Sequence, residues 1–144
     1  MANVIPDSFK TDLLKGTFNF DSSGGSTFKL ALYTDISGLT TSTTAFTTTN
    51  EVSTSGTSYS SDGNTLTNNG VAVSSNIAFV DFADLTFSSV TLSAVGALIY
   101  KSGGSNEAVL VLDFGGTKTA TNGDFVVQFP TASSSAAIIR LGNA

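Results

Sequence analysis

Residues 95–116, "VGALIYKSGGSNEAVLVLDFGG", decide the fold of this 144-residue chain. The stretch contains two apolar runs, 95–100 and 108–112, separated by the turn-forming residues "SGGSN" at 102–106. Each run is apolar on both of its alternating faces, which is typical of a strand that is covered on both sides of its sheet. The stretch therefore predicts two buried β-strands joined by a turn.

Similar signals extend in both directions from this stretch. Turn residues recur about every ten positions, and they separate short runs with period-two alternation. The pattern predicts about eight short strands in a single-domain, mainly β protein, an antiparallel β-sandwich of jelly-roll or immunoglobulin-like type. Asn122-Gly123 is a strong hairpin signal. The other expected elements are a hairpin over 17–35, strands near 66 and 71–73, a central strand over 77–82, a strand over 124–129 that Pro130 ends, and a last strand near 136–142.

The one helix signal lies at the N-terminus, over residues 5–16. Pro6 or Asp7 is suited to the first helical turn, and Gly16 is suited to the end. A helix this short is marginal by itself, so its apolar face must dock on its own domain or on a neighbouring subunit. That face consists of Phe9, Leu13 and Leu14.

A long Thr/Ser-rich loop is expected at residues 36–61, within a β-sandwich domain over 17–144 that follows an N-terminal arm over 1–16. At 40–56, "TTSTTAFTTTNEVSTSG", eleven of seventeen residues are Thr or Ser and only Glu51 is charged. Phe46, Val52 and Tyr59 recur often enough to hold the loop on the sandwich, and β-branched Thr favours extended backbone. A long ordered loop is usually functional, so an intersubunit contact is predicted here.

Composition excludes several classes of function. Charged residues make up 12% of the chain, the net charge is −5, and the six basic residues are scattered, so neither a nucleic-acid surface nor binding to an acidic membrane is expected. Cys and His are absent, which excludes Cys/His zinc sites, cysteine nucleophiles and histidine bases. No signal peptide and no membrane-spanning run is visible, so synthesis in a cytoplasm is expected.

Without Cys and His, the remaining candidates for catalysis are carboxylates, Lys, Tyr, Ser and Thr, and carboxylates could also bind a metal ion. A glycosidase pair could use Asp81 and Asp84, with Asp113 on a nearby strand, but strand ends and turns explain these residues better. We therefore predict no enzymatic activity, no metal and no cofactor. The possible calcium ligands, for which turn chemistry is again the better explanation, are Asp21, Asp35, Asp62 and Asp124.

Aromatic side chains offer one further binding hypothesis, a sugar platform. It would use Tyr33, Tyr59 and Tyr100, which are far apart in the sequence and are not accompanied by any Trp. Ordinary core and surface use is the better interpretation of these tyrosines, and no small-molecule ligand is expected.

Three segments, taken together, carry a family resemblance. They are "IPDSFKTDLLKGTFNF…TFKLALYT", "TTAFTTTNEVS…Y" and "VDFADLTFSSVTLSAVGALIYKS…NEAVLVLDFGG…GDFVVQFPTA…AAIIRL". They resemble a family of small structural proteins of tailed bacteriophages that is common in marine and cyanobacterial phages. The resemblance runs from about Ile5 to Leu141, and its most specific part is the order "GALIYKS", "VLDFGG", "FPTA".

The resemblance implies a virion structural protein that is made in the host cytoplasm. The first hypothesis is a head decoration, or cement, protein that forms a dimer or trimer on the outer capsid and bridges subunits of the major capsid protein. The alternative is a tail or tail-fibre component that contacts a host surface glycan, and a tail-tube or connector subunit is a third, weaker reading. The 40–56 stretch is then expected to contribute to an intersubunit or capsid contact. The residues expected at the interface are Phe9, Leu13, Leu14, Phe46, Val52 and Tyr59.

Overall fold

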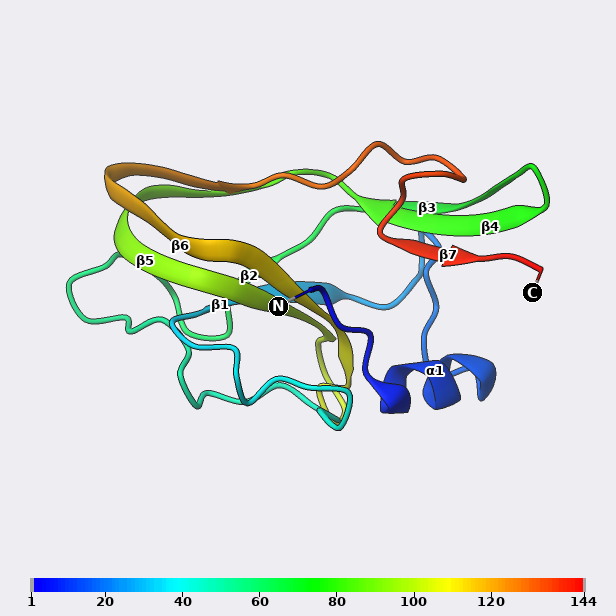
Figure 1. The fold of residues 1–144 in the computed structure, drawn as a ribbon, viewed down its shortest axis with the longest axis horizontal. Helices are drawn as coiled ribbons and strands as arrows, with labels where there is room; N and C mark the ends of the chain where they lie inside the picture. Colours follow the sequence, from blue (N-terminus) through cyan, green and yellow to red (C-terminus); the bar gives the residue numbers. More distant parts are fainter. Residues whose placement is uncertain (1, 144) are drawn as a thin grey trace.

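The computed structural model describes residues 2–143 of the chain and shows two antiparallel sheets and one short helix (Figure 1). The four-stranded sheet has the order β2-β1-β5-β6, and the three-stranded sheet has the order β3-β4-β7. This confirms a mainly β protein, with an arrangement consistent with a β-sandwich. The elements are α1 (Asp7–Leu14), β1 (Phe28–Tyr33), β2 (Asn64–Thr65), β3 (Asn68–Ser74), β4 (Ile77–Phe82), β5 (Leu85–Lys101), β6 (Ala108–Val127) and β7 (Ile139–Leu141).

A long curled hairpin, β5–β6, forms the framework of the protein. Its strands have 17 and 20 residues and pair from Leu85↔Val127 to Tyr100↔Ala108, with several register shifts between. The hairpin bends back over itself, so that its two halves lie in different layers (Figure 1). This explains why the chain has two very long strands where the sequence predicts several short ones.

The prediction of a hairpin turn at Asn122-Gly123 is wrong. Both residues lie inside β6, where Gly123 pairs with Val90 next to two register shifts. Asn122 has a φ of 46°, a left-handed conformation that Asn adopts at low cost. A β-bulge needs such a residue as much as a tight turn does, so the same dipeptide bends a continuous strand here.

The predicted hairpin over 17–35 is also wrong, because residues 17–27 form no strand and β1 pairs with β2 and β5 instead. Phe18 and Phe20 point into the core. The ring of Phe18 lies 4.9 Å from that of Phe9 on α1, and the ring of Phe20 is stacked 4.6 Å from that of Phe28 on β1. Phe residues at alternating positions indicate that one side of the segment is buried. An irregular segment can bury alternate side chains as well as a strand can.

Other expected elements are confirmed. Helix α1 falls inside the predicted range, with Pro6 before it and Gly16, at a φ of 81°, after it. Strand β4 is central in its sheet, and β7 forms near the C-terminal end of the described residues. The four-stranded sheet is covered on both faces: one apolar cluster lies between the layers, and a second includes Ala31, Leu98 and Val111.

Candidate functional site

The Thr/Ser segment, which we define as residues 36–61, contains no helix or strand among these fully described residues, only single bridges at Ala45 and Glu51. Its conformation is built by its own hydroxyl groups, because short side-chain oxygens accept hydrogen bonds from backbone amides two residues further on. This explains why the composition is so rich in Thr and Ser. In four such bonds, a backbone amide donates to the hydroxyl oxygen two residues earlier: Ser42 to Thr40, Thr49 to Thr47, Ser55 to Ser53 and Tyr59 to Thr57.

The segment also completes the edge of β1 beyond the short strand β2. The Val52 amide donates to the Leu32 carbonyl at 2.9 Å, and the Thr34 amide donates to the Asn50 carbonyl at 2.9 Å. The Leu32 amide in turn donates to the Tyr59 hydroxyl at 3.0 Å. An open strand edge is a template for uncontrolled pairing, and these contacts close it.

Three tyrosines that are distant in the sequence hold the segment in place. Tyr33, Tyr59 and Tyr100 are 0–3% exposed, and burial raises the pKa of each phenol, that of Tyr100 to about 12. A sugar platform needs exposed ring faces, so that hypothesis for these tyrosines is wrong. Their hydroxyls donate to the Thr47 carbonyl at 2.6 Å, the Glu51 carboxylate at 2.8 Å and the Asp62 carbonyl at 2.7 Å, respectively.

Glu51, the only charged residue of the segment, is the hub of this cluster. Its Oε1 accepts from the Tyr59 hydroxyl at 2.8 Å and from the Asp62 amide at 2.7 Å, and its Oε2 accepts from the Ser61 hydroxyl at 3.5 Å. No local pattern in the sequence indicates this hub. A lone carboxylate in a long uncharged stretch was the available signal, but its partners lie 8–11 residues further along the chain, and no local periodicity pairs residues at that separation.

Replacing Tyr59 by phenylalanine is expected to lower the free energy of unfolding by about 1–3 kcal/mol, because the buried Leu32 amide loses its acceptor and Glu51 loses a donor. Hydrogen exchange across 36–61 should rise as well. The matched control is Tyr100→Phe, which removes only one donor, to the carbonyl of the exposed Asp62, and should cost about 0.5–1.5 kcal/mol. Equal losses for the two variants in urea unfolding would contradict this assignment.

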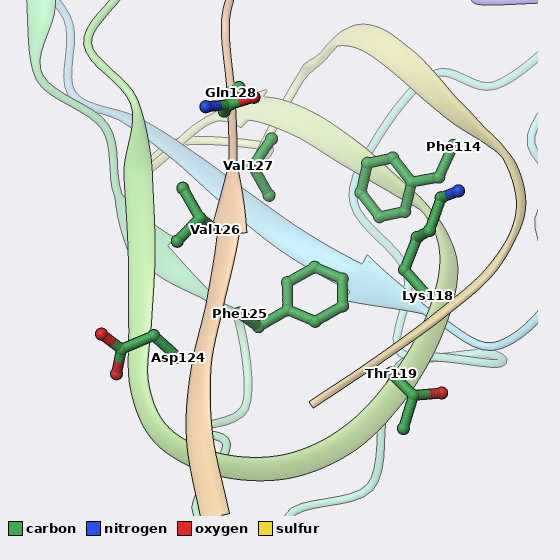
Figure 2. Close-up of a pocket in the computed structure, with 8 residues that line it drawn as sticks. All are labelled: Phe114, Lys118, Thr119, Asp124, Phe125, Val126, Val127 and Gln128. Carbon is green, nitrogen blue, oxygen red and sulfur yellow. The ribbon is translucent and has the colours of Figure 1, made fainter. Parts of the chain in front are cut away.

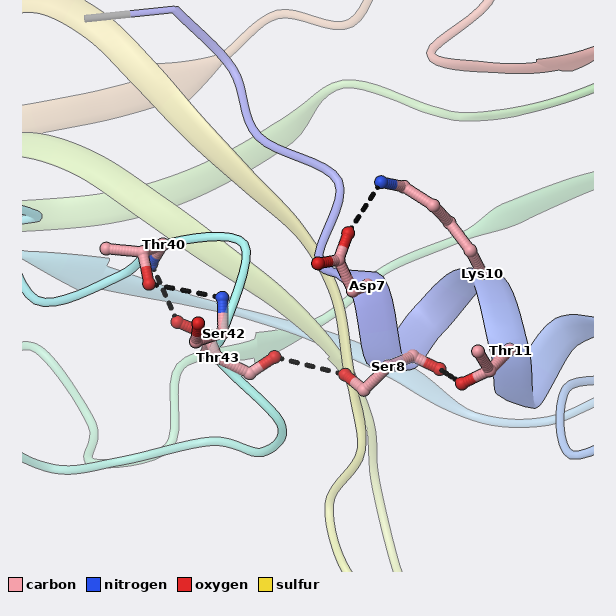
Figure 3. A network of polar contacts seen from close by, with 7 residues as sticks. All are labelled: Asp7, Ser8, Lys10, Thr11, Thr40, Ser42 and Thr43. Atoms are coloured by element: carbon pink, nitrogen blue, oxygen red, sulfur yellow. Dashed lines mark hydrogen bonds and ion pairs between the residues drawn. The ribbon is translucent and has the colours of Figure 1, made fainter.

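The N-terminal end of helix α1 docks on the Thr/Ser segment (Figure 3). The Asp7 amide donates to the Thr41 carbonyl at 2.9 Å, and the Ser8 hydroxyl donates to the Thr43 carbonyl at 3.1 Å. The Thr40 amide donates to the Thr43 hydroxyl at 2.8 Å, which tightens the turn that receives the helix. The structure thus brings together the two elements that the sequence analysis selected for docking.

The six side chains predicted at an interface have different environments. Phe9, Val52 and Tyr59 belong to the protein's own core, so they have no surface to offer a partner in this conformation. Leu13 and Phe46 are half-buried, and the ring of Phe46 is stacked on that of Tyr100 at 4.6 Å. Leu14 is 87% exposed.

The carboxylates considered for catalysis serve the backbone. The Asp81 carboxylate accepts from the Phe82 amide at 2.9 Å, and Asp84 accepts from the Phe129 amide at 2.8 Å. Asp113 accepts from the Gly115 amide at 2.8 Å, and this bond is the main cause that lowers its pKa. Asp84 follows the end of β4, whereas Asp81 lies within β4 and Asp113 within β6, and each of the three accepts a hydrogen bond from a backbone amide.

Asp81 is buried, and within residues 2–143 its Oδ2 accepts no hydrogen bond. Burial raises the pKa of this carboxyl, against the opposing effect of the nearby Phe82 and Ile138 amides. A carboxyl with a raised pKa binds its proton more tightly in the folded state than in the unfolded state. Its contribution to stability is therefore present at low pH, and it is lost as the pH rises from about 3.8 through the folded-state pKa.

The Asp81→Asn variant tests this assignment. Relative to the wild type, the variant should gain stability as the pH rises from 3 to 7, because asparagine carries no charge to bury. Urea unfolding of both proteins at several pH values checks the prediction, since the other carboxylates are common to both and cancel in the difference. A difference that does not change with pH would contradict it.

The acids considered for calcium binding do not converge. The Asp35 carboxylate accepts from the Ser37 amide and hydroxyl, which lowers its pKa, and Asp124 accepts from the Ser89 amide. Asp21 and Asp62 belong to two other turns. Within residues 2–143, no group of three or more acidic side chains is placed to hold a metal ion.

A groove with a volume of roughly 520 Å³ lies along β6. Its apolar lining includes Phe114 and Phe125, whose ring centres are 6.0 Å apart, and its polar residues include Lys118, Asp124 and Gln128. Figure 2 shows the ring of Phe125 projecting into the bend of the hairpin while Asp124 points away from it. The lining offers a mixed apolar and polar contact surface.

Comparisons with protein-family models, with curated proteins and with solved structures gave no match. The only helix among the described residues, α1, has 8 residues and is too short to cross a membrane.

Proposed function

We propose that this protein is a non-enzymatic structural protein of a tailed-bacteriophage virion, and that it decorates the capsid by bridging subunits of the major capsid protein. The observation that carries the proposal is the Thr/Ser segment, a long surface of hydroxyl groups that is held in one conformation by the tyrosines and Glu51. The sequence resemblance to phage structural proteins supplies the biological setting.

Two physical features suit this surface to assembly. Ser and Thr side chains are short, so ordering them at an interface costs less conformational entropy than ordering long side chains. The single charge of the segment already has partners within the protein, so no unpaired charge would be desolvated on contact. Modest contacts of this kind become strong when they are repeated across a symmetric shell.

The absence of enzymatic activity and the finer fold class are parts of the same proposal. In support, the candidate catalytic carboxylates accept backbone hydrogen bonds, as strand-end and turn residues do. We place the protein among sandwiches of the jelly-roll or immunoglobulin-like kind, with residues 36–61 as the long loop, since two antiparallel sheets are common to both.

A capsid-binding assay tests the proposal. Purified protein is added to capsids that lack it, and binding and heat stability of the capsids are measured. We expect binding and a higher melting temperature with the wild type, and loss of both with Thr48→Lys, which places a long charged side chain on the segment. The matched control is Thr121→Lys, since Thr121 is an exposed threonine on β6, and this variant should still bind.

The number of copies of this protein per virion distinguishes a head decoration protein from a tail component. Mass spectrometry of intact virions should find the protein in numbers comparable to the major capsid protein. A copy number typical of tail proteins, together with no binding to capsids, would overturn the decoration role and favour the tail or tail-fibre alternative.

A further inference from the structure

One end of the molecule, formed by α1 and the sheet β3-β4-β7, carries an unusual concentration of exposed apolar side chains (Figure 1). Among the described residues, five large apolar side chains are strongly exposed, and Val126 is the only one away from this end. The other four are Leu14, Val71, Val73 and Leu141, with exposed fractions of 87%, 55%, 70% and 57%. A shallow hollow lined by Val71, Leu141 and the neighbouring Leu13 joins the helix to the sheet. An apolar patch of this kind marks an interaction surface.

The outer edge of β3 forms one border of this patch, and half of it is open. At its start, Asn68 Nδ2 donates to the Phe20 carbonyl at 2.8 Å, and Gly70 lies against Ser22. From Val71 onward, residues 71–74 are all exposed, and within the described chain their backbone has no hydrogen bonds other than those with β4.

None of the usual protections against edge pairing is present over 71–74. Native edges are blunted by charged side chains, by Pro or by a bulge. The sequence "VAVS" contains no charge and no Pro, and the register irregularity of β3 lies earlier, between Asn68 and Val71.

The distribution of charge indicates which partner fits this edge. The protein carries a net charge of −5, so two copies repel each other wherever charged surfaces meet. Residues 63–80, which include all of β3 and most of β4, contain no charged side chain. A second copy of the same neutral edge can therefore approach without bringing two like charges together.

We propose that β3 is a self-association surface, through which two copies pair antiparallel about a two-fold axis at Ala72. The two three-stranded sheets then become one six-stranded sheet. Antiparallel pairing is self-complementary under a two-fold axis, so a single strand supplies both halves of the contact. Val71 of each copy then lies opposite Val73 of the other copy. Both valines lie on the sheet face that carries Val80 and Ala78. This identifies the self-contact that the proposed structural role calls for and rests on that role.

The first test measures the mass of the purified chain in solution. Sedimentation equilibrium should find a dimer for the wild type, a monomer for Val73→Lys and a dimer for the matched control Val126→Lys. Val73 is 70% exposed, so the lysine is compatible with the fold, which circular dichroism verifies. A wild type that is monomeric at every concentration, or a Val73→Lys variant as dimeric as the wild type, overturns the proposal.

The second test does not depend on a disruptive variant. The chain contains no Cys, so a single cysteine reports one contact. Ala72→Cys places two thiols across the two-fold axis at a Cα separation that permits a disulfide, and oxidation should give a covalent dimer on a non-reducing gel. Val126→Cys, treated identically, should remain monomeric on the gel.

Equal cross-linking of the two cysteine variants would overturn the proposed axis. Both tests use the purified chain alone, whereas the capsid assay tests the virion role. A dimer that fails to bind capsids would therefore contradict the proposed function only, and a monomer that binds capsids would contradict only the β3 contact.

Discussion

Replacing Phe28 by alanine is expected to lower the free energy of unfolding by about 3–5 kcal/mol, because a buried ring is removed and a cavity remains. Phe28 is 1% exposed and links separate parts of the core. Its ring is stacked on Phe20 at 4.6 Å with an interplanar angle of 4°, and it meets the edge of Phe82, on β4, at 5.8 Å. A domain of this size is stable by about 5–15 kcal/mol, so the loss is a large part of the total.

Urea unfolding followed by circular dichroism measures this loss. Phe129→Ala is the matched control, since that ring also contacts Phe82, at 5.7 Å, but is only half-buried. The control should lose clearly less than the Phe28 variant. Equal losses would mean that Phe28 does not connect the layers in the way the ring contacts indicate.

Replacing Gly63 by alanine is expected to cost at least about 3 kcal/mol, because a left-handed backbone and a steric conflict act together. Gly63 has a φ of 72°, and a Cβ atom there would lie 1.8 Å from the Leu30 carbonyl oxygen on β1. The chain would have to move away from β1 next to Asp62, whose carbonyl accepts a hydrogen bond from the Tyr100 hydroxyl and whose amide donates one to Glu51. Hydrogen exchange should therefore rise throughout the Thr/Ser segment.

Gly56→Ala separates the two causes. Gly56 has nearly the same φ, 73°, but no atom lies within 4 Å of the position that its Cβ would take. This control should cost only the conformational term, about 1 kcal/mol. If both alanine variants lose the same stability in urea and leave exchange of 36–61 unchanged, close contact between Gly63 and β1 is not what holds the segment.

Much of the secondary structure was predictable from local patterns. The two-sided apolar runs 95–100 and 108–112 lie in β5 and β6. Helix α1 begins directly after Pro6 and ends shortly before Gly16, as these two residues predict. These predictions succeeded because period-two alternation and helix-boundary residues act on neighbouring positions.

The environment of the predicted contact residues was less predictable. The recurrence of Val52 and Tyr59 predicts that they hold the loop on the sandwich, and they do contact β1. Both were also predicted at an interface, although both are buried. The exposed valines of β3 were not selected, because alternation along a strand does not reveal where the opposite layer ends.

The sequence by itself determined the β-rich class, the N-terminal helix and a long Thr/Ser segment with a single charged residue, Glu51. Only the tertiary structure decided that Asn122-Gly123 bends a strand and that Phe18 and Phe20 fill the core from a segment that forms no strand. It also decided that Tyr33, Tyr59 and Tyr100 meet around Glu51 and Asp62. The physical reason is that propensity and periodicity are set by neighbouring residues. Pairing partners and burial depend on contacts between residues that are distant in the chain.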